Sequence, residues 1–362
     1  MARVFFSAGE ASGDAYAAAL IRRLPDGFDA LGVGGPQAAA AGMAPVGDSS
    51  RWGAVGIYES LKVVPRVLAG YRAAFAALTE GRPGVFVPID YGFMNIRLAR
   101  HARQMGWKVV YFIPPGSWRK DRQGADLPEV SDAIITPFAW SADILRRMGA
   151  NAHWFGHPLK QLVYESRSEG ARNGLAVLPG SRDHEVTANL EVIAQAADRL
   201  GASPLRLAAA PNLPDDLVKD RWATFSQTPA EIVQPARRAL WQSQAAIVCS
   251  GTATLEAALA HCPCVVVYRG TRAMKIEFAI RKPKFDFISL PNILLGRGAV
   301  TELLSDDANP DRICAAMEPL LAESQTRSAM LAAFAEVDEM CGPADAIDRS
   351  AALIAEIATA QS

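Results

Sequence analysis

The turn between two apolar runs near residue 250 constrains the fold of this chain more than any other stretch. Ala245–Cys249 and Cys264–Tyr268 are each apolar enough to form a buried strand, and Ala257–Cys262 between them is expected to be helical. Pro263 cannot extend that helix. A strand, a helix and a second strand in this order form a βαβ unit, which requires a parallel sheet.

The turn itself reads Ser250-Gly251-Thr252-Ala253-Thr254-Leu255-Glu256. Gly251 permits close approach of the backbone, and Ser250, Thr252 and Thr254 offer hydroxyls beside the free amides of a helix N-terminus, where an anion is favoured. Glu256 either interacts favourably with the positive end of the helix dipole or accepts hydrogen bonds from a ribose diol. Taken alone, the turn is compatible both with a well-capped helix and with a phosphate site.

The same alternation of apolar run, turn and helix recurs along the chain, and it predicts an α/β fold with two Rossmann-like domains facing a cleft. We expect an N-terminal domain over 1–158, a C-terminal domain over 159–340, and a final helix over 341–362 that packs back on the first domain. The pattern also predicts a strand at Phe225–Thr228 and a strand with its turn over Phe287-Ile288-Ser289-Leu290-Pro291-Asn292. The Gly-x-Gly-x-x-Gly fingerprint is absent from the sequence, which counts against a dinucleotide cofactor.

Composition narrows the class of protein further. The formal net charge of the 362 residues is −1, so no global field favours nucleic acid. Most of the five cysteines are expected to be reduced core residues, and Cys262-Pro-Cys264 lacks the second pair that a zinc site needs. No apolar run approaches the roughly 20 residues that span a bilayer. Any membrane contact is therefore expected to be peripheral.

Apolar residues between positions 52 and 78 follow a helical spacing, with basic residues among them and Pro65 as a break or kink. Such a stripe either faces the core or, in a basic helix, lies in a membrane interface.

Carboxylates mark two of the first-half turns. Glu10 and Asp14 lie in the turn after Arg3–Ser7, which suits sugar hydroxyls or an acid–base role better than phosphate. Asp90 directly follows the strand Val85–Ile89. Ligand sites of open α/β sheets form at that end of a strand, so Asp90 is a candidate base.

Six segments, in order, resemble lipid-A-disaccharide synthase, a two-Rossmann glycosyltransferase family of the B type. The segments are Ala8-Gly9-Glu10-Ala11-Ser12-Gly13-Asp14, Ile89-Asp90, Gly156-His157-Pro158-Leu159, Leu178-Pro179-Gly180-Ser181-Arg182 with Glu185, Ser250 to Glu256, and Ser289-Leu290-Pro291-Asn292 with Glu302-Leu303-Leu304. Single matches of this length are weak, but six in sequence order are specific.

The resemblance implies transfer of 2,3-diacylglucosamine from its UDP donor to 2,3-diacylglucosamine 1-phosphate, without a metal or another cofactor. It also implies a peripheral membrane enzyme at the cytoplasmic face of the inner membrane, often a dimer. Asp90 would deprotonate the attacking 6-hydroxyl, with Glu10, Ser12 and Asp14 lining the acceptor side. On the donor side, the implied groups are Arg182, Glu185, Ser250, Gly251, Thr252, Ala253, Thr254, Glu256 and Asn292.

The chain departs from the family pattern only in its first half. The second acid that usually follows the base is missing from Asp90-Tyr91-Gly92-Phe93-Met94-Asn95, one tryptophan remains in Pro115 to Lys120, and Ala139 replaces an acid after Pro137-Phe138. These changes concern the acceptor more than the donor. The alternatives are therefore a related transferase with another acceptor, a UDP-sugar 2-epimerase, and a non-catalytic protein that binds a nucleotide sugar or a lipid.

Overall fold

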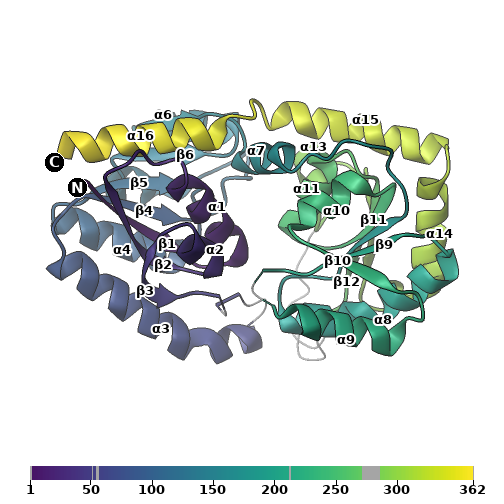
Figure 1. Cartoon of the computed structure of the whole chain (residues 1–362). Helices are drawn as coiled ribbons and strands as arrows, with labels where there is room; N and C mark the ends of the chain where they lie inside the picture. Colours follow the sequence, from purple (N-terminus) through teal and green to yellow (C-terminus); the bar gives the residue numbers. More distant parts are fainter. Residues whose placement is uncertain (1, 51, 54–56, 212, 271–285, 362) are drawn as a thin grey trace. The chain divides into compact units, whose positions relative to one another are not determined.

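The computed structural model describes residues 2–50, 52–53, 57–211, 213–270 and 286–361. The chain divides into two compact units, Met1–Gln161 with Cys341–Ser362, and Leu162–Met340. Each is an α/β unit built on a parallel sheet, as Figure 1 shows. The α/β class with two Rossmann-like units is thereby confirmed.

The first unit contains a seven-stranded sheet in the order β3-β2-β1-β4-β5-β6-β7. Its first six positions follow the 3-2-1-4-5-6 order of the doubly wound fold. The elements are β1 (Ala2–Ala8), α1 (Ala11–Ile21), β2 (Phe28–Gly34), α2 (Pro36–Ala40), β3 (Ala44–Asp48), α3 (Ile57–Glu80), β4 (Val85–Ile89), α4 (Gly92–Gln104), β5 (Lys108–Phe112), α5 (Leu127–Val130), β6 (Ala133–Thr136), α6 (Ala139–Arg147), β7 (Ala152–Trp154), α7 (Pro158–Glu165) and, at the chain's end, α16 (Ala346–Gln361). Helix α7 continues past Gln161 into the second unit.

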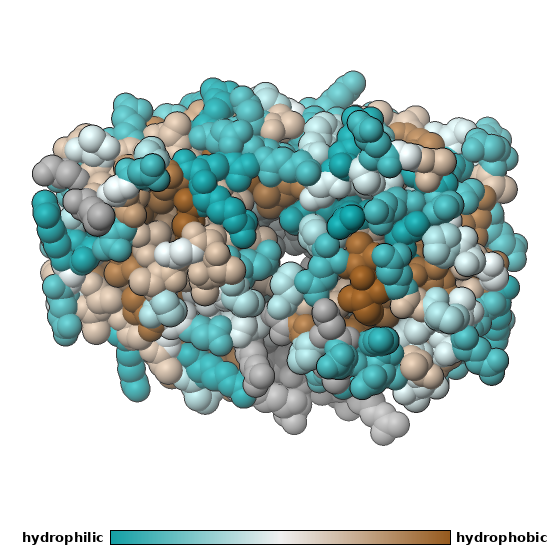
Figure 2. All heavy atoms as spheres, viewed as in Figure 1, coloured by the Kyte–Doolittle hydropathy of each residue, from teal (hydrophilic) through white to brown (hydrophobic). Residues whose placement is uncertain are grey.

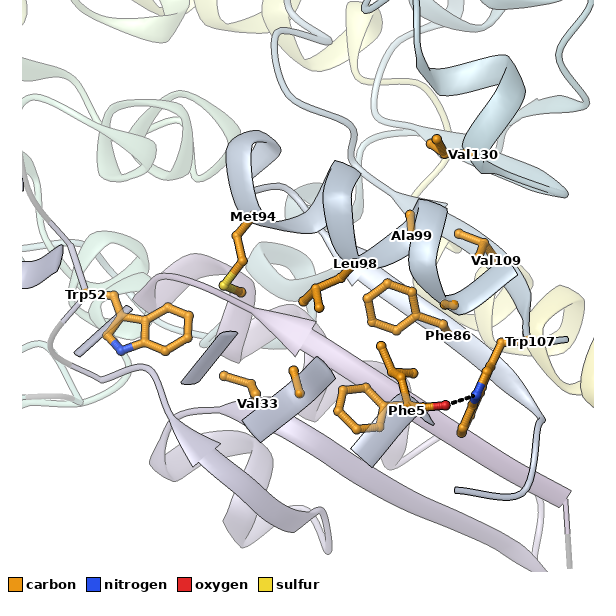
Figure 3. Packing of buried hydrophobic residues seen from close by; sticks show 13 residues of the cluster. Phe5, Val33, Trp52, Phe86, Met94, Leu98, Ala99, Trp107, Val109 and Val130 are labelled. Atoms are coloured by element: carbon orange, nitrogen blue, oxygen red, sulfur yellow. Dashed lines mark hydrogen bonds between the residues drawn. The ribbon is translucent and has the colours of Figure 1, made fainter. Parts of the chain in front are cut away.

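One hydrophobic cluster of the first unit lies between the sheet and helices α3 and α4. Strand residues such as Phe5 and Phe86 pack against apolar side chains from the helices, among them Leu98 (Figure 3). The indole of Trp107, fully inside this core, donates to the carbonyl of Leu78 at 2.9 Å, drawn as a dashed line in Figure 3. The buried donor is therefore satisfied, as the cost of an unpaired indole demands.

Helix α3 has two apolar faces. Val67, Tyr71, Ala74 and Leu78 pack on the core at helical spacing. Leu61, Val64, Leu68 and Phe75 instead remain exposed, with 64% of Leu61 open to solvent. The helix runs through Pro65, which does not end it. The apolar stripe predicted from the sequence is therefore only partly a core face. Residues 54–56 of that stripe lie outside the described residues.

The last helix, α16, packs on α1, β1 and β4 within the first unit. The chain reaches it through Gly342, whose φ of +68° favours glycine. An added Cβ at this glycine would lie 2.4 Å from the ring of Trp154.

The second unit contains a six-stranded sheet in the order β10-β9-β8-β11-β12-β13, again the 3-2-1-4-5-6 arrangement. Its elements are β8 (Leu175–Leu178), α8 (Asp183–Leu200), β9 (Leu205–Ala208), α9 (Asp215–Phe225), β10 (Ala230–Val233), α10 (Ala236–Gln242), β11 (Ala245–Cys249), α11 (Thr252–Leu259), β12 (Cys264–Tyr268), α13 (Leu290–Leu295), β13 (Thr301–Leu304), the short 3-10 turn η1 (Ser305–Asp307), α14 (Pro310–Leu321) and α15 (Gln325–Met340).

Two predicted strands of the second unit are wrong. Phe225 ends helix α9, where Trp222 is buried at helical spacing, and the strand begins only at Ala230. The run around Leu290 forms helix α13, because Pro291 in its first turn suits a helix start and Glu302 binds the amides that precede the helix.

None of the five cysteines, all of which lie in the described residues, forms a disulfide, and four of them are buried, as expected for reduced core residues. Figure 2 shows a mostly hydrophilic face with hydrophobic residues in separate patches. In the part of the chain that the structure describes, no helix combines the length and apolarity needed to cross a bilayer.

Candidate active site

Glu10 and Asp90 follow neighbouring strands of the first sheet. Strands β1 and β4 run parallel, and Ala8 pairs with Ile89 at their carboxyl ends. Asp90 is the next residue after β4, and Glu10 follows β1 by two positions before α1 begins. Strand order reverses at this pair of strands, which is where ligands bind in open α/β sheets. The sheet thus brings the two predicted carboxylates to one edge.

The electrostatics of this edge favour a protonatable Asp90. Burial by the surrounding protein is the main cause that raises the pKa of Asp90 to about 6, and the negative charge of Glu10 adds to it. The backbone hydrogen bond from Tyr91 acts in the opposite direction. Asp90 nevertheless keeps a solvent-exposed surface, so a ligand can reach it. A carboxylate with a pKa near neutrality is suited to take up a proton in a reaction.

The Asp14 carboxylate is occupied by the protein itself, at the turn that follows the neighbouring parallel strand β2. Its side chain is buried and accepts hydrogen bonds from the backbone amides of Gly35 (2.7 Å), Gln37 (3.0 Å) and Ala38 (3.0 Å). These amides belong to the start of helix α2, whose unpaired N–H groups need acceptors. Both oxygens of Asp14 are therefore engaged in holding the β2–α2 turn. Ser12, in the first turn of α1, is half-buried.

In the second unit, the turns that follow β8 and β11 lie at one edge, since these strands are parallel neighbours and Leu178 pairs with Val248. Asn189, which sequence reasoning missed, ties them together. Its side-chain amide donates to the carbonyl of Pro179 (3.1 Å) and to Cys249 Sγ (3.3 Å), while its oxygen accepts from the amide of Arg269 (2.8 Å). Nothing in the sequence distinguishes this buried helical asparagine from a solvated one.

Arg182 and Glu185 form an ion pair at 2.5 Å at the start of α8. Glu185 is buried and also accepts from the backbone amides of Ser181 (3.1 Å) and Arg182 (3.3 Å), which completes a capping box. Glu185 thus supports the turn from within. The Arg182 side chain is 20% exposed, and its ion pair with Glu185 fixes the orientation of the guanidinium.

In the turn from Ser250 to Glu256, the hydroxyls of Ser250 and Thr254 bond within the protein. Ser250 Oγ donates to the carbonyl of Ile288 (3.1 Å). Thr254 Oγ1 donates to the carbonyl of Gly251 (2.8 Å) and accepts from the amide of Leu290 (3.1 Å). Gly251, at φ +141°, is exposed, and the half-buried Thr252 and Ala253 follow it as the first residues of α11. The groups that α11 can offer an anion are therefore its first backbone amides and the hydroxyl of Thr252, rather than those of Ser250 and Thr254.

Asn292 and Glu256, the two remaining residues predicted to bind the UDP-sugar donor, are also engaged within the protein. Asn292 is buried; its amide donates to the carbonyl of Val300 (2.9 Å) and to Glu302 (2.8 Å), and its oxygen accepts from the amides of Ala299 and Val300. Glu256 pairs with Arg237, a residue on α10 that sequence reasoning missed. The structure places Asn292 in a supporting network around α13.

Among the described residues, no group of three or more His, Cys, Asp or Glu side chains is arranged to hold a metal ion.

Comparisons with known proteins identify the family of the chain. A model of the lipid-A-disaccharide synthetase family matches residues 4–350. The lipid-A-disaccharide synthase of Koribacter versatilis is 33% identical over 357 residues, which cover 94% of this chain and 93% of that protein. The enzyme of the same name from Erwinia tasmaniensis is 33% identical, with 91% and 92% covered.

Solved structures with low sequence identity share the fold. The glycotransferase of kitacinnamycin has a TM-score of 0.62 at 14% identity, with 98% of each chain covered. A putative UDP-N-acetylglucosamine 2-epimerase from Listeria monocytogenes has a TM-score of 0.58 at 13% identity, covering 97% of this chain and 95% of its own. At such identities these likenesses show the fold alone.

The two parallel sheets, together with these relatives, define a hexosyltransferase of the two-domain B type. Within that class, the chain belongs to the lipid-A-disaccharide synthetase family and is a glycosyltransferase of lipid A synthesis. The resemblance of the six segments to this family is thereby confirmed.

Proposed function

We propose that this hexosyltransferase joins two acylated glucosamines, taking 2,3-diacylglucosamine from its UDP donor and 2,3-diacylglucosamine 1-phosphate as the acceptor. The single observation that carries the proposal is Asp90, a carboxylate with a raised pKa at the carboxyl end of β4 beside Glu10, in a chain matched to the family over residues 4–350.

The reaction needs one proton transfer and one bond exchange. Asp90 takes the proton of the acceptor's 6-hydroxyl as that oxygen attacks C1 of the donor sugar. The bond between C1 and the pyrophosphate oxygen breaks, and UDP leaves with its electron pair. The products are a β-1,6-linked disaccharide 1-phosphate and UDP. No metal ion or cofactor enters this scheme.

We assign the donor to the second unit. Arg182 is oriented by Glu185 and is suited to the UDP pyrophosphate, whose negative charge grows as the bond breaks. The amides of Thr252 and Ala253, at the start of α11 beside Gly251, would add donors to the same phosphates. Glu256 would bind the ribose. Glu185, Asn292 and the hydroxyls of Ser250 and Thr254 would keep these groups in place.

We assign the acceptor to the first unit, with Glu10 and Ser12 lining its site, and the charge of Glu10 acts on the proposed base Asp90. Asp14 acts there indirectly, since its carboxylate holds the β2–α2 turn.

The test is release of UDP by the purified chain with the diacylglucosamine pair in detergent micelles. Asp90→Asn should lower turnover by roughly 10²- to 10⁴-fold, the usual contribution of a general base. Normal turnover by this variant would exclude Asp90 as the base. Release of UDP only with another labelled acceptor would identify a related transferase, epimer formation without acceptor would identify an epimerase, and UDP binding without release would identify a binding protein.

We further propose peripheral contact with the cytoplasmic face of the inner membrane through the exposed side chains of α3. Leu61, Val64 and Leu68 are each at least 42% exposed on one helix. Leu61→Ser with Leu68→Ser should reduce co-sedimentation with phosphatidylglycerol vesicles and leave UDP affinity unchanged. Undiminished co-sedimentation would exclude this face. A homodimer, which the family resemblance implies, is tested by sedimentation equilibrium.

A further inference from the structure

The backbone at the proposed base is held in a left-handed conformation. Asp90 has φ +46° and Tyr91 has φ +48°. These two consecutive non-glycine residues thus adopt backbone angles that favour glycine. Helix α4 begins immediately afterwards at Gly92. Such backbone persists only where surrounding contacts enforce it, and it concentrates at functional positions.

Hydrogen bonds hold Asp90 from both sides. Its N–H donates to the carbonyl of Phe112 on β5 at 3.2 Å. Its carbonyl accepts from Asn95 Nδ2 at 2.9 Å and from the hydroxyl of Tyr111 at 3.0 Å. Both donors are fully buried and come from different elements, α4 and β5. The main chain at Asp90 is thus tied to the first sheet and to the following helix.

Asn95 is itself locked in one orientation. Its Nδ2 also lies 3.1 Å from the carbonyls of Ser7 and Ile89, and its Oδ1 accepts from Ser7 Oγ at 2.7 Å. The backbone carbonyls can only accept, so the NH₂ group must face them. The hydroxyl of Ser7 must then donate to the other end of the amide. All three side chains, Ser7, Asn95 and Tyr111, are buried without exposed surface.

We propose that Asn95, oriented by Ser7 and assisted by Tyr111, is a positioning residue that fixes the Asp90 backbone and so aims the carboxylate at the acceptor hydroxyl. The inference rests on the proposed function, in which Asp90 is the base. A base must stand within hydrogen-bond reach of the proton it takes, and a displacement of about 1 Å can cost roughly 10²-fold in rate.

A purely structural role is the alternative, in which Asn95 closes the β4–α4 turn without affecting the base. The two roles differ in kinetics. A positioning role lowers kcat and leaves the KM of each substrate nearly unchanged, because only a transition-state interaction is lost. The rate loss from substituting Asn95 should also disappear when the base is already absent, because the effects of residues that act as one unit are not additive.

The experiment is therefore a double-mutant cycle measured by single-turnover transfer of labelled donor sugar. Asn95→Ala should lower the rate by about 10²-fold and Tyr111→Phe by about fivefold, the latter corresponding to one lost hydrogen bond. In an Asp90→Asn background the same changes should each cost less than about twofold. Tyr164→Phe is the matched control, since it removes a tyrosine hydroxyl that donates to Asp338 at 2.8 Å in the other unit, and it should retain the full rate.

Equal losses in both backgrounds, or a rise in KM with unchanged kcat, would overturn the positioning role while leaving Asp90 as the base. Unchanged turnover in Asp90→Asn alone would instead remove the base assignment and the inference with it. If Asn95→Ala fails to fold, Tyr111→Phe decides the question, because it retains the buried ring and deletes only the hydroxyl.

Discussion

The guanidinium of Arg237 lies 3.2 Å from the carboxylate of Glu256, and the two side chains are only 16% and 12% exposed. Arg237 comes from α10 and Glu256 from α11, so the pair joins two helices on one side of the second sheet. Arg237 engages Oε1 of the carboxylate, and the proposed ribose would bond to Oε2. The ion pair thus orients the residue assigned to the sugar of the donor nucleotide.

Glu256→Gln should weaken UDP binding by about tenfold, because a hydrogen bond to a charged acceptor is stronger than one to a neutral amide. Titration calorimetry with UDP and with 2′,3′-dideoxy-UDP measures the effect. The dideoxy analogue lacks the diol and should bind both proteins alike. If the binding of both ligands is weakened equally, Glu256 stabilises the fold and does not contact the ribose diol. The exposed Glu231→Gln is the matched control.

The pH dependence of kcat/KM should contain an acidic limb set by Asp90. Its pKa is about 6, so the base is ionised above that pH, and the rate should fall about tenfold per unit below it. Glu10→Gln should move the limb to lower pH, since the charge of Glu10 raises this pKa. Initial rates between about pH 5 and 8 test both statements. A limb that persists unchanged in Asp90→Asn would belong to another group.

The left-handed backbone at Asp90 has a consequence for stability. Glycine adopts such φ values freely, whereas an L-residue there costs roughly 1–2 kcal/mol. Asp90→Gly should therefore unfold at higher denaturant concentration than Asp90→Ala, with a difference of about 1 kcal/mol in the free energy of unfolding. Chemical denaturation followed by circular dichroism compares them. An alanine variant as stable as the glycine variant would show that φ is relaxed at this position.

Asp14→Ala should destabilise the first unit by about 2–4 kcal/mol, because buried amides at the start of α2 would lose their acceptor. Asp14→Asn retains one oxygen and should lie between Asp14→Ala and the wild type. The exposed Asp26→Ala serves as the control and should change stability by less than about 0.5 kcal/mol. Denaturant unfolding gives these values. If Asp14→Ala is as stable as the wild type and has a raised KM for the acceptor, Asp14 binds the acceptor instead of stabilising the turn.

The architecture could be predicted from the sequence because it depends on local periodicity. Apolar runs such as Val85–Ile89 and Ala245–Cys249 are buried on both faces in parallel sheets, so they stand out against the amphipathic helices that separate them. The errors lie where apolar residues were assigned to the wrong period. Phe225 is the last residue of helix α9, and Leu290 is the first residue of helix α13.

The sequence by itself determined the class of fold, the family and the residues at the strand ends, since each of these is written in short contiguous segments. Only the tertiary structure decided what those residues contact. Asp14, Glu185 and Asn292 bear polar groups as suitable for a ligand as those of Asp90, yet buried backbone amides, or an adjacent arginine or glutamate, occupy them. Asn95 and Arg237 likewise acquire importance only from their partners, Ser7 and Glu256 among them. A hydrogen bond needs its donor and acceptor within about 3 Å, and only folding brings such partners together.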